Sequence, residues 1–158
     1  ADLIENTEDH ITEAAVEASA TKLIPAGSVV CVVRSGILKH SFPVALLGRD
    51  MCINQDLIAF RPTTGALSSK FLFYVLKTKS ASIIEEGIKP GVTVQSFYNG
   101  FFRDYLVPLP PLATQQAIVA EIEAEQGLVA ANRELISRFE KKIQATLARV
   151  WGEEPEPR

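Results

Sequence analysis

A proline pair followed by a long proline-free segment is the feature that most constrains this sequence. Pro110 and Pro111 stand together, and the next proline is Pro155. Proline fits at the first turn of a helix but not inside it, because it lacks a backbone N–H and clashes with the preceding turn. We therefore predict one helix from about Thr114 to Trp151, roughly 55 Å long at ~1.5 Å per residue. Such a helix is longer than a small domain needs and must bury one face against another surface.

The predicted helix carries a regular stripe of side chains. Its positions alternate in steps of four and three residues, which is the period of a coiled coil. The predicted interface residues are Ile118, Ile122, Val129, Asn132, Ile136, Phe139, Ile143 and Val150, with Glu125 and Thr146 between them. Asn132 would fix the register of a helix pair at some cost in stability. The alternative is a helix that folds back on its own domain, because Leu128 and Leu135 widen the stripe.

The chain before the prolines alternates between strand and helix signals. Runs rich in β-branched residues predict strands over residues 28–33, 42–47, 51–60 and 104–109. Helical spacing predicts helices over 10–21, from Ser68 or Ser69 onward, and over 80–86 with Gly87 as the stop. The expected fold class is α+β, a mainly antiparallel β-sheet domain with short helices, followed by one long C-terminal coiled-coil-type helix. The expected divisions are residues 1–109, the helix at 110–151 and a flexible tail at 152–158.

The composition favours a cytoplasmic protein without a membrane segment. The 158 residues can bury a sizeable core, and no run of ~18 apolar residues occurs. The first twenty residues lack the apolar core of an export signal. Cys31 and Cys52 lie in apolar runs and are expected to be reduced, with a disulfide as the alternative.

Motifs of common enzyme classes do not occur in the sequence. It contains no G-x-S-x-G elbow, P-loop, G-x-G-x-x-G or H-E-x-x-H. His10 and His40 lie in unrelated segments, and two cysteines with two distant histidines do not make a four-ligand zinc site. We therefore predict no catalytic residues, no metal site and no cofactor on this chain.

Charge is unevenly distributed along the chain. The total is −3, but residues 1–22 carry −5, residues 23–107 carry +4 and residues 108–158 carry −2. A basic middle is compatible with a face that binds phosphate groups. A charge of +4 over 85 residues is also typical of ordinary surface, and charge alone favours that simpler interpretation.

The segment "LVPLPPLATQQAIVAEIE" resembles the junction between a target recognition domain and a long conserved helix in specificity subunits of type I restriction–modification systems. The matching positions are Pro108 to Leu112, Gln115 or Gln116, Ile118 and Val119. The segments "IPAGSVVCVVRSGILKH", "INQDLIAFRP" and "GVTVQSFYNGFFRDYLVPLPPL" are similar to upstream parts of the same family, in the same order. The resemblance covers about residues 20–151.

This resemblance implies a non-catalytic subunit that reads double-stranded DNA. Family members usually carry two recognition domains and two helices, whereas this chain has one of each and a short N-terminal segment. It would be a half-subunit or a fragment that reads one half of a bipartite target and pairs with a second copy through its helix. The implied partners are methyltransferase subunits and a restriction subunit, which would carry the S-adenosylmethionine and ATP.

Two polar segments are the candidate DNA contacts under this resemblance. The first, "RSGILKHS", offers Arg34, Ser35, Lys39 and His40, together with Ser41. The second, "KPGVTVQSFYN", offers Lys89, Thr93, Gln95, Ser96, Tyr98 and Asn99. Arginine can bind guanine O6 and N7, and glutamine and asparagine suit adenine N6 and N7.

The simpler interpretation is that both segments are ordinary polar connections. Arg49, Arg61 and Arg103 would then be solvated edge residues rather than part of a basic face. The alternative function is an α+β scaffold that dimerises through its helix and does not bind DNA.

Overall fold

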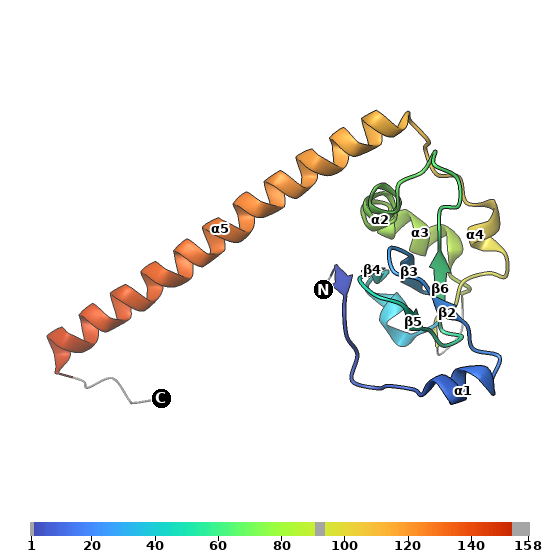
Figure 1. Ribbon diagram of the computed structural model, residues 1–158. Helices are drawn as coiled ribbons and strands as arrows, with labels where there is room; N and C mark the ends of the chain where they lie inside the picture. Colours follow the sequence, from blue (N-terminus) through green and yellow to red (C-terminus); the bar gives the residue numbers. More distant parts are fainter. Residues whose placement is uncertain (1, 91–93, 153–158) are drawn as a thin grey trace. The chain divides into compact units, whose positions relative to one another are not determined.

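The computed structural model describes residues 2–90 and 94–152, and the chain forms two compact units, Ala1–Val119 and Ala120–Arg158. The elements of the first unit before the long helix are β1 (Leu3–Ile4), α1 (Glu13–Glu17), β2 (Leu23–Ile24), β3 (Val29–Val32), the 3₁₀ turn η1 (Gly36–Lys39), β4 (Val44–Leu47), β5 (Met51–Cys52), β6 (Leu57–Phe60), α2 (Ser69–Thr78), α3 (Ser80–Gly87) and α4 (Phe101–Asp104) (Figure 1). The helix α5 (Leu112–Trp151) begins in the first unit and makes up most of the second.

The main sheet has four strands in the order β1-β4-β3-β6. The central strand β3 pairs antiparallel with β4 and with β6, so that Cys31 lies opposite Val44 on one side and Ile58 on the other. The edge strand β1 runs parallel to β4, and β2 with β5 forms a separate antiparallel pair. The predicted α+β class, with a mainly antiparallel sheet, short helices and a long C-terminal helix, is therefore confirmed.

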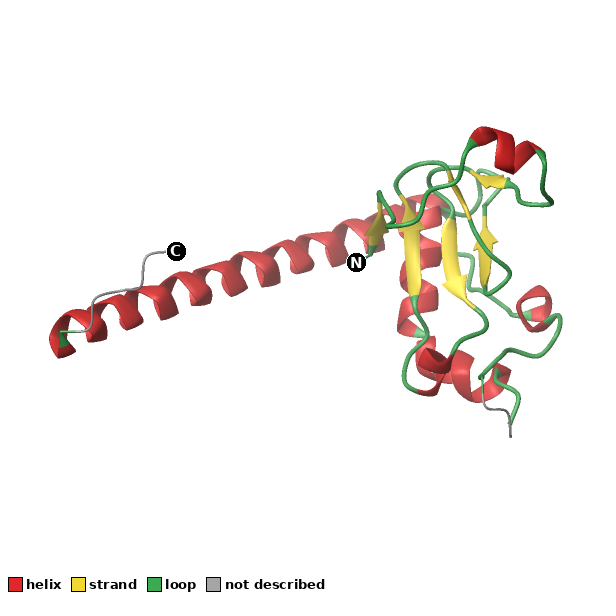
Figure 2. Cartoon of the chain, turned by 90° about the horizontal axis from the view of Figure 1, so that it is seen from below, coloured by secondary structure: helices red, strands yellow, loops and turns green. Residues whose placement is uncertain are grey.

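Alternation along β3 divides the core into two clusters, as the period of two in a strand requires. Val29 and Cys31 face α2 and α3, where they pack with Phe73 and Ile83. Val30 faces the opposite side and packs with Ala45 and Leu47. Figure 2 shows the strands of the main sheet edge to edge, with helices packed against the sheet. Both faces of β3 are buried, which explains why its sequence is an uninterrupted apolar run.

The predicted strand over residues 51–60 is wrong in one respect, since it is two strands in two different sheets. The chain turns between β5 and β6, where the Asn54 side chain accepts a hydrogen bond of 3.0 Å from the backbone N–H of Asp56. Asparagine favours such turns because its short side chain imitates a backbone acceptor. Apolar residues on both sides of the turn make residues 51–60 resemble one continuous strand in the sequence.

The predicted strand over residues 104–109 is also wrong. The short helix α4, entered through Gly100 with a φ of 82°, ends at Asp104, and residues 105–111 form neither a strand nor a helix before α5 begins. Pro108 and Pro110 cannot donate the hydrogen bonds that a ladder needs. Phe101 and Phe102 instead turn toward the aromatic side chains of the core.

Two smaller predictions also change in detail. The helix predicted over 10–21 is only α1, which begins after Thr12, whose side chain accepts a hydrogen bond from the N–H of Ala15. The loop predicted after β3 contains the turn η1, anchored by the buried Leu38. Cys31 and Cys52 are both free thiols, as expected.

The long helix is continuous over 40 residues and is followed by Gly152 with a φ of 71°, as a glycine stop requires. Only Gln115 and Val119 are buried among its residues. Among the residues that the structure describes, no helix combines the length and apolar character needed to span a bilayer.

Candidate nucleic-acid interface

The end of β3 and the segment after α3 lie side by side in the first unit. Arg34 and Ser96 form an isolated antiparallel bridge. The N–H of Ser35 donates to the carbonyl of Gln95 over 3.0 Å, and the N–H of Phe97 donates to the carbonyl of Val33 over 3.2 Å. The two candidate segments are therefore joined by backbone hydrogen bonds, although more than fifty residues separate them in sequence.

A third segment, the exit of α3, completes this arrangement. The N–H of Lys89 donates to the carbonyl of Ser96, and the N–H of Tyr98 donates to the carbonyl of Gly87, both over 2.9 Å. Ile88 and Phe97 form a second isolated antiparallel bridge. Residues 95–98 thus run between the end of β3 and the exit of α3. Backbone bonding on both sides gives their side chains a defined position.

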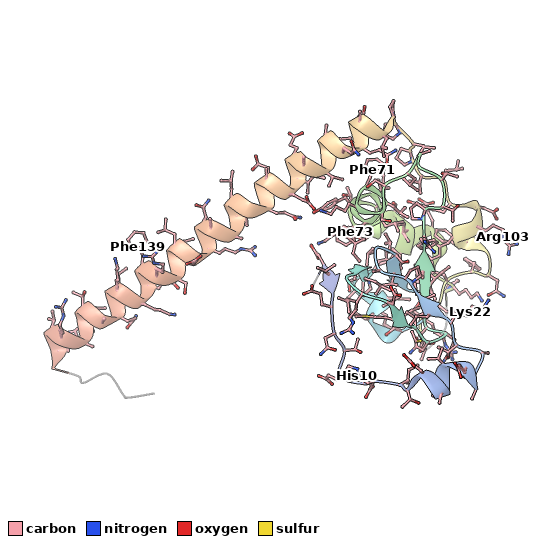
Figure 3. All side chains as sticks on the ribbon, viewed as in Figure 1. His10, Lys22, Phe71, Phe73, Arg103 and Phe139 are labelled. Atoms are coloured by element: carbon pink, nitrogen blue, oxygen red, sulfur yellow. The ribbon has the colours of Figure 1, made fainter. Side chains whose placement is uncertain are left out.

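These segments border a groove with a volume of about 870 Å³, to which β6 and α4 also contribute. We call the lining residues with polar side chains the groove residues. They are Arg34, Lys89, Ser96, Tyr98, Asn99 and Arg103. Three of them are cationic, and the lining contains no aspartate or glutamate among the residues that the structure describes. Arg34, Tyr98, Asn99 and Arg103 are exposed to solvent. Figure 3 shows Arg103 on α4, at the surface of the first unit.

Aromatic side chains form the floor of the groove. The ring centroid of Phe97 lies 4.8 Å from that of Phe102 and 5.4 Å from that of Phe101. The rings of Phe101 and Phe102 meet edge to face at 5.1 Å. Edge-to-face contact is a favourable geometry for aromatic pairs, and all three centroid distances lie in the favourable range of ~4.5–7 Å. The cluster therefore holds α4, and with it Arg103, against the segment that carries Ser96.

Five of the ten predicted DNA-contacting residues line this groove. They are Arg34, Lys89, Ser96, Tyr98 and Asn99. Gln95 lies in the same segment and hydrogen-bonds Ser35 through its backbone, but it is not part of the lining. Thr93 lies outside the residues that the structure describes.

The other candidates of the first segment lie on η1 or directly beside it, and outside the groove lining. The hydroxyl oxygen of Ser35 accepts a hydrogen bond of 3.3 Å from the N–H of Ile37, so this side chain caps η1. Lys39 and His40 lie at the end of η1 and are exposed. Ser41 follows them and is also exposed. Ser35 therefore has a structural role in addition to the predicted contact.

Arg103 lines the groove but is not among the ten DNA-contacting residues predicted from the sequence. It was expected to be either an edge residue or part of a basic face, next to a predicted strand. The short helix α4 brings it to the groove instead. The signal was the pair Phe101–Phe102 directly before it, since two adjacent aromatic residues after Gly100 need a buried surface.

The groove offers hydrogen-bond donors and positive charge rather than a metal centre. No group of three or more His, Cys, Asp or Glu side chains in the described part of the chain could hold a metal ion. Guanidinium, ammonium, hydroxyl and carboxamide groups suit phosphate oxygens and the edges of bases. The Cys31 thiol lies in the core, where burial raises its pKa from 9.0 to about 12.

A second candidate surface lies on α5. We call its residues the seam: Ile118, Ile122, Val129, Asn132, Ile136, Phe139, Ile143 and Val150. Ile136 is 57% exposed, Phe139 53% and Ile143 58%, so large apolar side chains face solvent in this chain. Figure 3 shows Phe139 standing on the surface of the helix. Leu128 and Leu135 beside the seam are exposed as well, which widens the apolar stripe.

Comparison with known proteins gives a consistent result. The family described as "Type I restriction modification DNA specificity domain" matches residues 3–137. The specificity subunit of the Escherichia coli type I restriction enzyme EcoR124I/EcoR124II is 37% identical over 117 residues, which is 74% of this chain and 29% of that protein. The Methanocaldococcus jannaschii type I restriction enzyme MjaIX specificity subunit is 26% identical over 154 residues, which is 98% of this chain and 34% of that protein.

A solved structure resembles this one in fold. It comes from work on the structural basis underlying complex assembly and conformational transition of the type I R-M system. The match has a TM-score of 0.60 and 25% identity, and it covers 84% of this chain and 30% of the other. The chain spans about a third of the length of each of these relatives.

Proposed function

This chain belongs to the family of type I restriction modification DNA specificity domains, and we propose that it reads one half of a bipartite DNA target without catalysing a reaction itself. The groove residues would make the contacts. The main support is the joining of the two candidate segments by the Arg34–Ser96 bridge, which gathers three cations around one groove. A face of this kind can bind the phosphate backbone and present polar groups to the bases.

Each groove residue has a proposed role that follows from its chemistry. Arg34 would bind O6 and N7 of a guanine, and Asn99 would bind N6 and N7 of an adenine. Lys89, Ser96 and Arg103 would bind phosphate oxygens. Tyr98 is exposed and would contact either phosphate or a base edge. Lys39 and His40 would extend this surface along η1, together with Thr93 and Gln95 from the second segment.

We further propose that two copies pair through the seam, because its large apolar side chains are exposed to solvent. Burying a large apolar side chain is worth ~1.5–3 kcal/mol, and association costs ~4–15 kcal/mol. Burial of all seven apolar residues of the seam would exceed this cost except near its upper limit. A two-fold symmetric pair would bind a nearly palindromic target with a central gap.

The methyltransferase and restriction subunits are the proposed protein partners, and they would carry the S-adenosylmethionine and ATP. The helix α5 would act as a spacer and as a docking surface for them. A DNA ligand also implies that the chain acts in the cytoplasm. The competing function is a scaffold that dimerises through the seam without binding DNA, which the exposed apolar residues of α5 would serve equally well.

Selection from a pool of random duplexes tests this function. The unmodified chain should enrich two conserved half-sites in inverted orientation with a constant gap. A variant with Arg34→Ala should enrich a pool with relaxed preference at one position of each half-site. Recovery of random sequences, with no binding above that of an unrelated protein of similar charge, would favour the scaffold.

A further inference from the structure

Gln115 is a fully buried polar residue at the start of a helix that is otherwise almost entirely exposed. Its carboxamide makes three hydrogen bonds. The oxygen Oε1 accepts from the backbone N–H of Ser68 over 2.9 Å. The nitrogen Nε2 donates to the carbonyl of Ala66 over 2.7 Å and to the carbonyl of Pro110 over 2.8 Å. Both amide hydrogens are therefore used, and the buried polar group is well satisfied.

The bond from Ser68 replaces a missing local cap on α2. Ser68 is the N-cap residue of α2, and its own side chain makes no capping hydrogen bond. In a capping box, a Glu or Gln three residues later accepts the N–H of the N-cap residue. That position in α2 is Phe71, which is buried and cannot accept. Gln115 supplies the missing acceptor from 47 residues further along the chain.

One of the other two bonds holds the connection into α5, and the second reaches back to the segment before α2. The carbonyl of Pro111 accepts from the N–H groups of Thr114 and Gln115, so the helix begins directly after the prolines. Nε2 of Gln115 holds Pro110 on one side and Ala66 on the other. One turn later on the same face, Val119 is only 7% exposed. The first two turns of α5 are thus bonded and packed within the first unit.

We propose that Gln115 is a positioning residue that couples the N-terminal end of α2 to the start of α5, and that this coupling restricts the gap between half-sites. The proposal rests on the proposed function, because a gap exists only if two recognition units bind one duplex. Helix length alone cannot hold a gap constant if the helix is free to pivot at its first turn. A carboxamide that is bonded to the segment before α2 and to the junction at Pro110 would restrict that freedom.

Two variants separate this role from general stability. Gln115→Met keeps the length of the side chain but removes its two donors and its carbonyl oxygen. Ser68→Pro keeps Gln115 and removes the one N–H that Oε1 accepts, at a φ of −82° that is close to the range of proline. The matched control is Gln116→Met, the same substitution at the neighbouring exposed residue.

Hydrogen exchange tests the bond without DNA. The Ser68 amide should exchange about tenfold faster in Gln115→Met, the factor that corresponds to one hydrogen bond of typical net strength. It should be unchanged in Gln116→Met. An unchanged rate in Gln115→Met would overturn the proposed coupling.

Binding to a spacer series tests the consequence. The duplexes carry the selected half-site twice in inverted orientation, with gaps that differ by single base pairs. The unmodified chain and Gln116→Met should prefer one gap sharply. Gln115→Met and Ser68→Pro should bind a single half-site as before but lose most of the discrimination between gaps. If Gln115→Met does not fold, Ser68→Pro carries the test.

The outcomes distinguish this inference from the function on which it rests. If Gln115→Met loses affinity equally for every gap and for a single half-site, and still discriminates between gaps, Gln115 is merely structural. The inference would then be wrong, while DNA recognition by the chain stands. If the unmodified chain binds no duplex, the proposed function itself is wrong, and the role in spacing falls with it.

Discussion

Gly87, the last residue of α3, lies directly against the ring of Phe97. A Cβ atom added to Gly87 would lie 2.5 Å from Cδ1 of Phe97 and 2.9 Å from Cε1 of Phe101. Its carbonyl also accepts the hydrogen bond from Tyr98. The helix ends at Gly87 as predicted, but the φ of this residue is not in the left-handed region that a glycine stop adopts. The glycine is needed because the groove floor approaches the helix too closely for any side chain.

Gly87→Ala should therefore destabilise the first unit. Overpacking of this kind typically costs about 1–3 kcal/mol, and it should also displace the segment that carries Ser96 and Tyr98. Chemical denaturation at equal protein concentration measures the loss. The control is Gly127→Ala on α5, where no atom lies within 4 Å of the added Cβ. That change should raise stability by about 0.5–1 kcal/mol, because alanine is the better helix former. A Gly87→Ala protein as stable as the unmodified chain would contradict the tight contact.

The long helix was the easiest element to predict because its signals are local. The proline pair marks where α5 begins, within two residues of the expected Thr114, and Gly152 marks its end. The break between β5 and β6 and the helix α4 were missed for a different reason. Their apolar residues resemble strands, and the outcome depends on the turn at Asn54 and on the packing of Phe101 and Phe102.

The groove was predictable only in part, for a related reason. Arg34, Lys89, Ser96, Tyr98 and Asn99 stand in short polar segments next to glycine or proline, which is a signal within the sequence. The groove itself exists because the end of β3 hydrogen-bonds to residues 95–97, and no local pattern encodes that pairing. The buried contacts of Gln115 with Ser68 and Ala66 are equally long-range. In the sequence, Gln115 therefore stood out only through the family resemblance.

Cys31 should be unreactive in the folded protein. Burial raises the pKa of its thiol from 9.0 to about 12, so the neutral form is favoured in the folded state. At pH 9 a thiol reagent should modify the half-buried Cys52 first and Cys31 only after denaturant is added. Mass spectrometry of the labelled peptides checks this order.

The same pKa predicts that the stability of the fold decreases at alkaline pH. A raised pKa in the folded state stabilises the protein below the unfolded pKa of 9.0, and this contribution is lost as the pH rises toward about 12. The difference in free energy of unfolding between the unmodified chain and Cys31→Ala should therefore shrink over that range. A constant difference between pH 9 and pH 12 would speak against the buried neutral thiol.

Ile136→Asp should separate the proposed dimer. It introduces an unpaired carboxylate at the middle of the seam, and burying a charge without a partner is strongly unfavourable. Sedimentation should show a dimer for the unmodified chain and a monomer for the variant. Ser137→Asp adds the same charge at the adjacent exposed position and should remain a dimer. A monomeric unmodified chain at tens of micromolar would point to another partner for the seam.

Arg34→Ala should distinguish base reading from phosphate binding. If Arg34 binds a guanine, the change should cost ~1–3 kcal/mol on the selected site and relax the preference at that base pair. If it binds phosphate, all sequences should weaken together and the salt dependence should fall by about one unit of slope. Competition binding with single-base variants of the half-site separates the two results. An unaltered affinity for every duplex would remove Arg34 from the interface.

The most direct test of the central claim is the salt dependence of duplex binding when the three cations of the groove are neutralised together. The variant Arg34→Gln, Lys89→Gln, Arg103→Gln is compared with a control in which Arg138, Lys141 and Lys142 of α5 are changed to Gln. If the groove binds the DNA backbone, the first variant should lose about 1.8 from the slope of log affinity against log salt, at ~0.9 for each of the proposed phosphate contacts of Lys89 and Arg103, and about 2.7 if Arg34 also contacts phosphate. The control should keep the slope of the unmodified chain. Equal slopes for the groove variant and the unmodified chain would contradict DNA recognition by this groove.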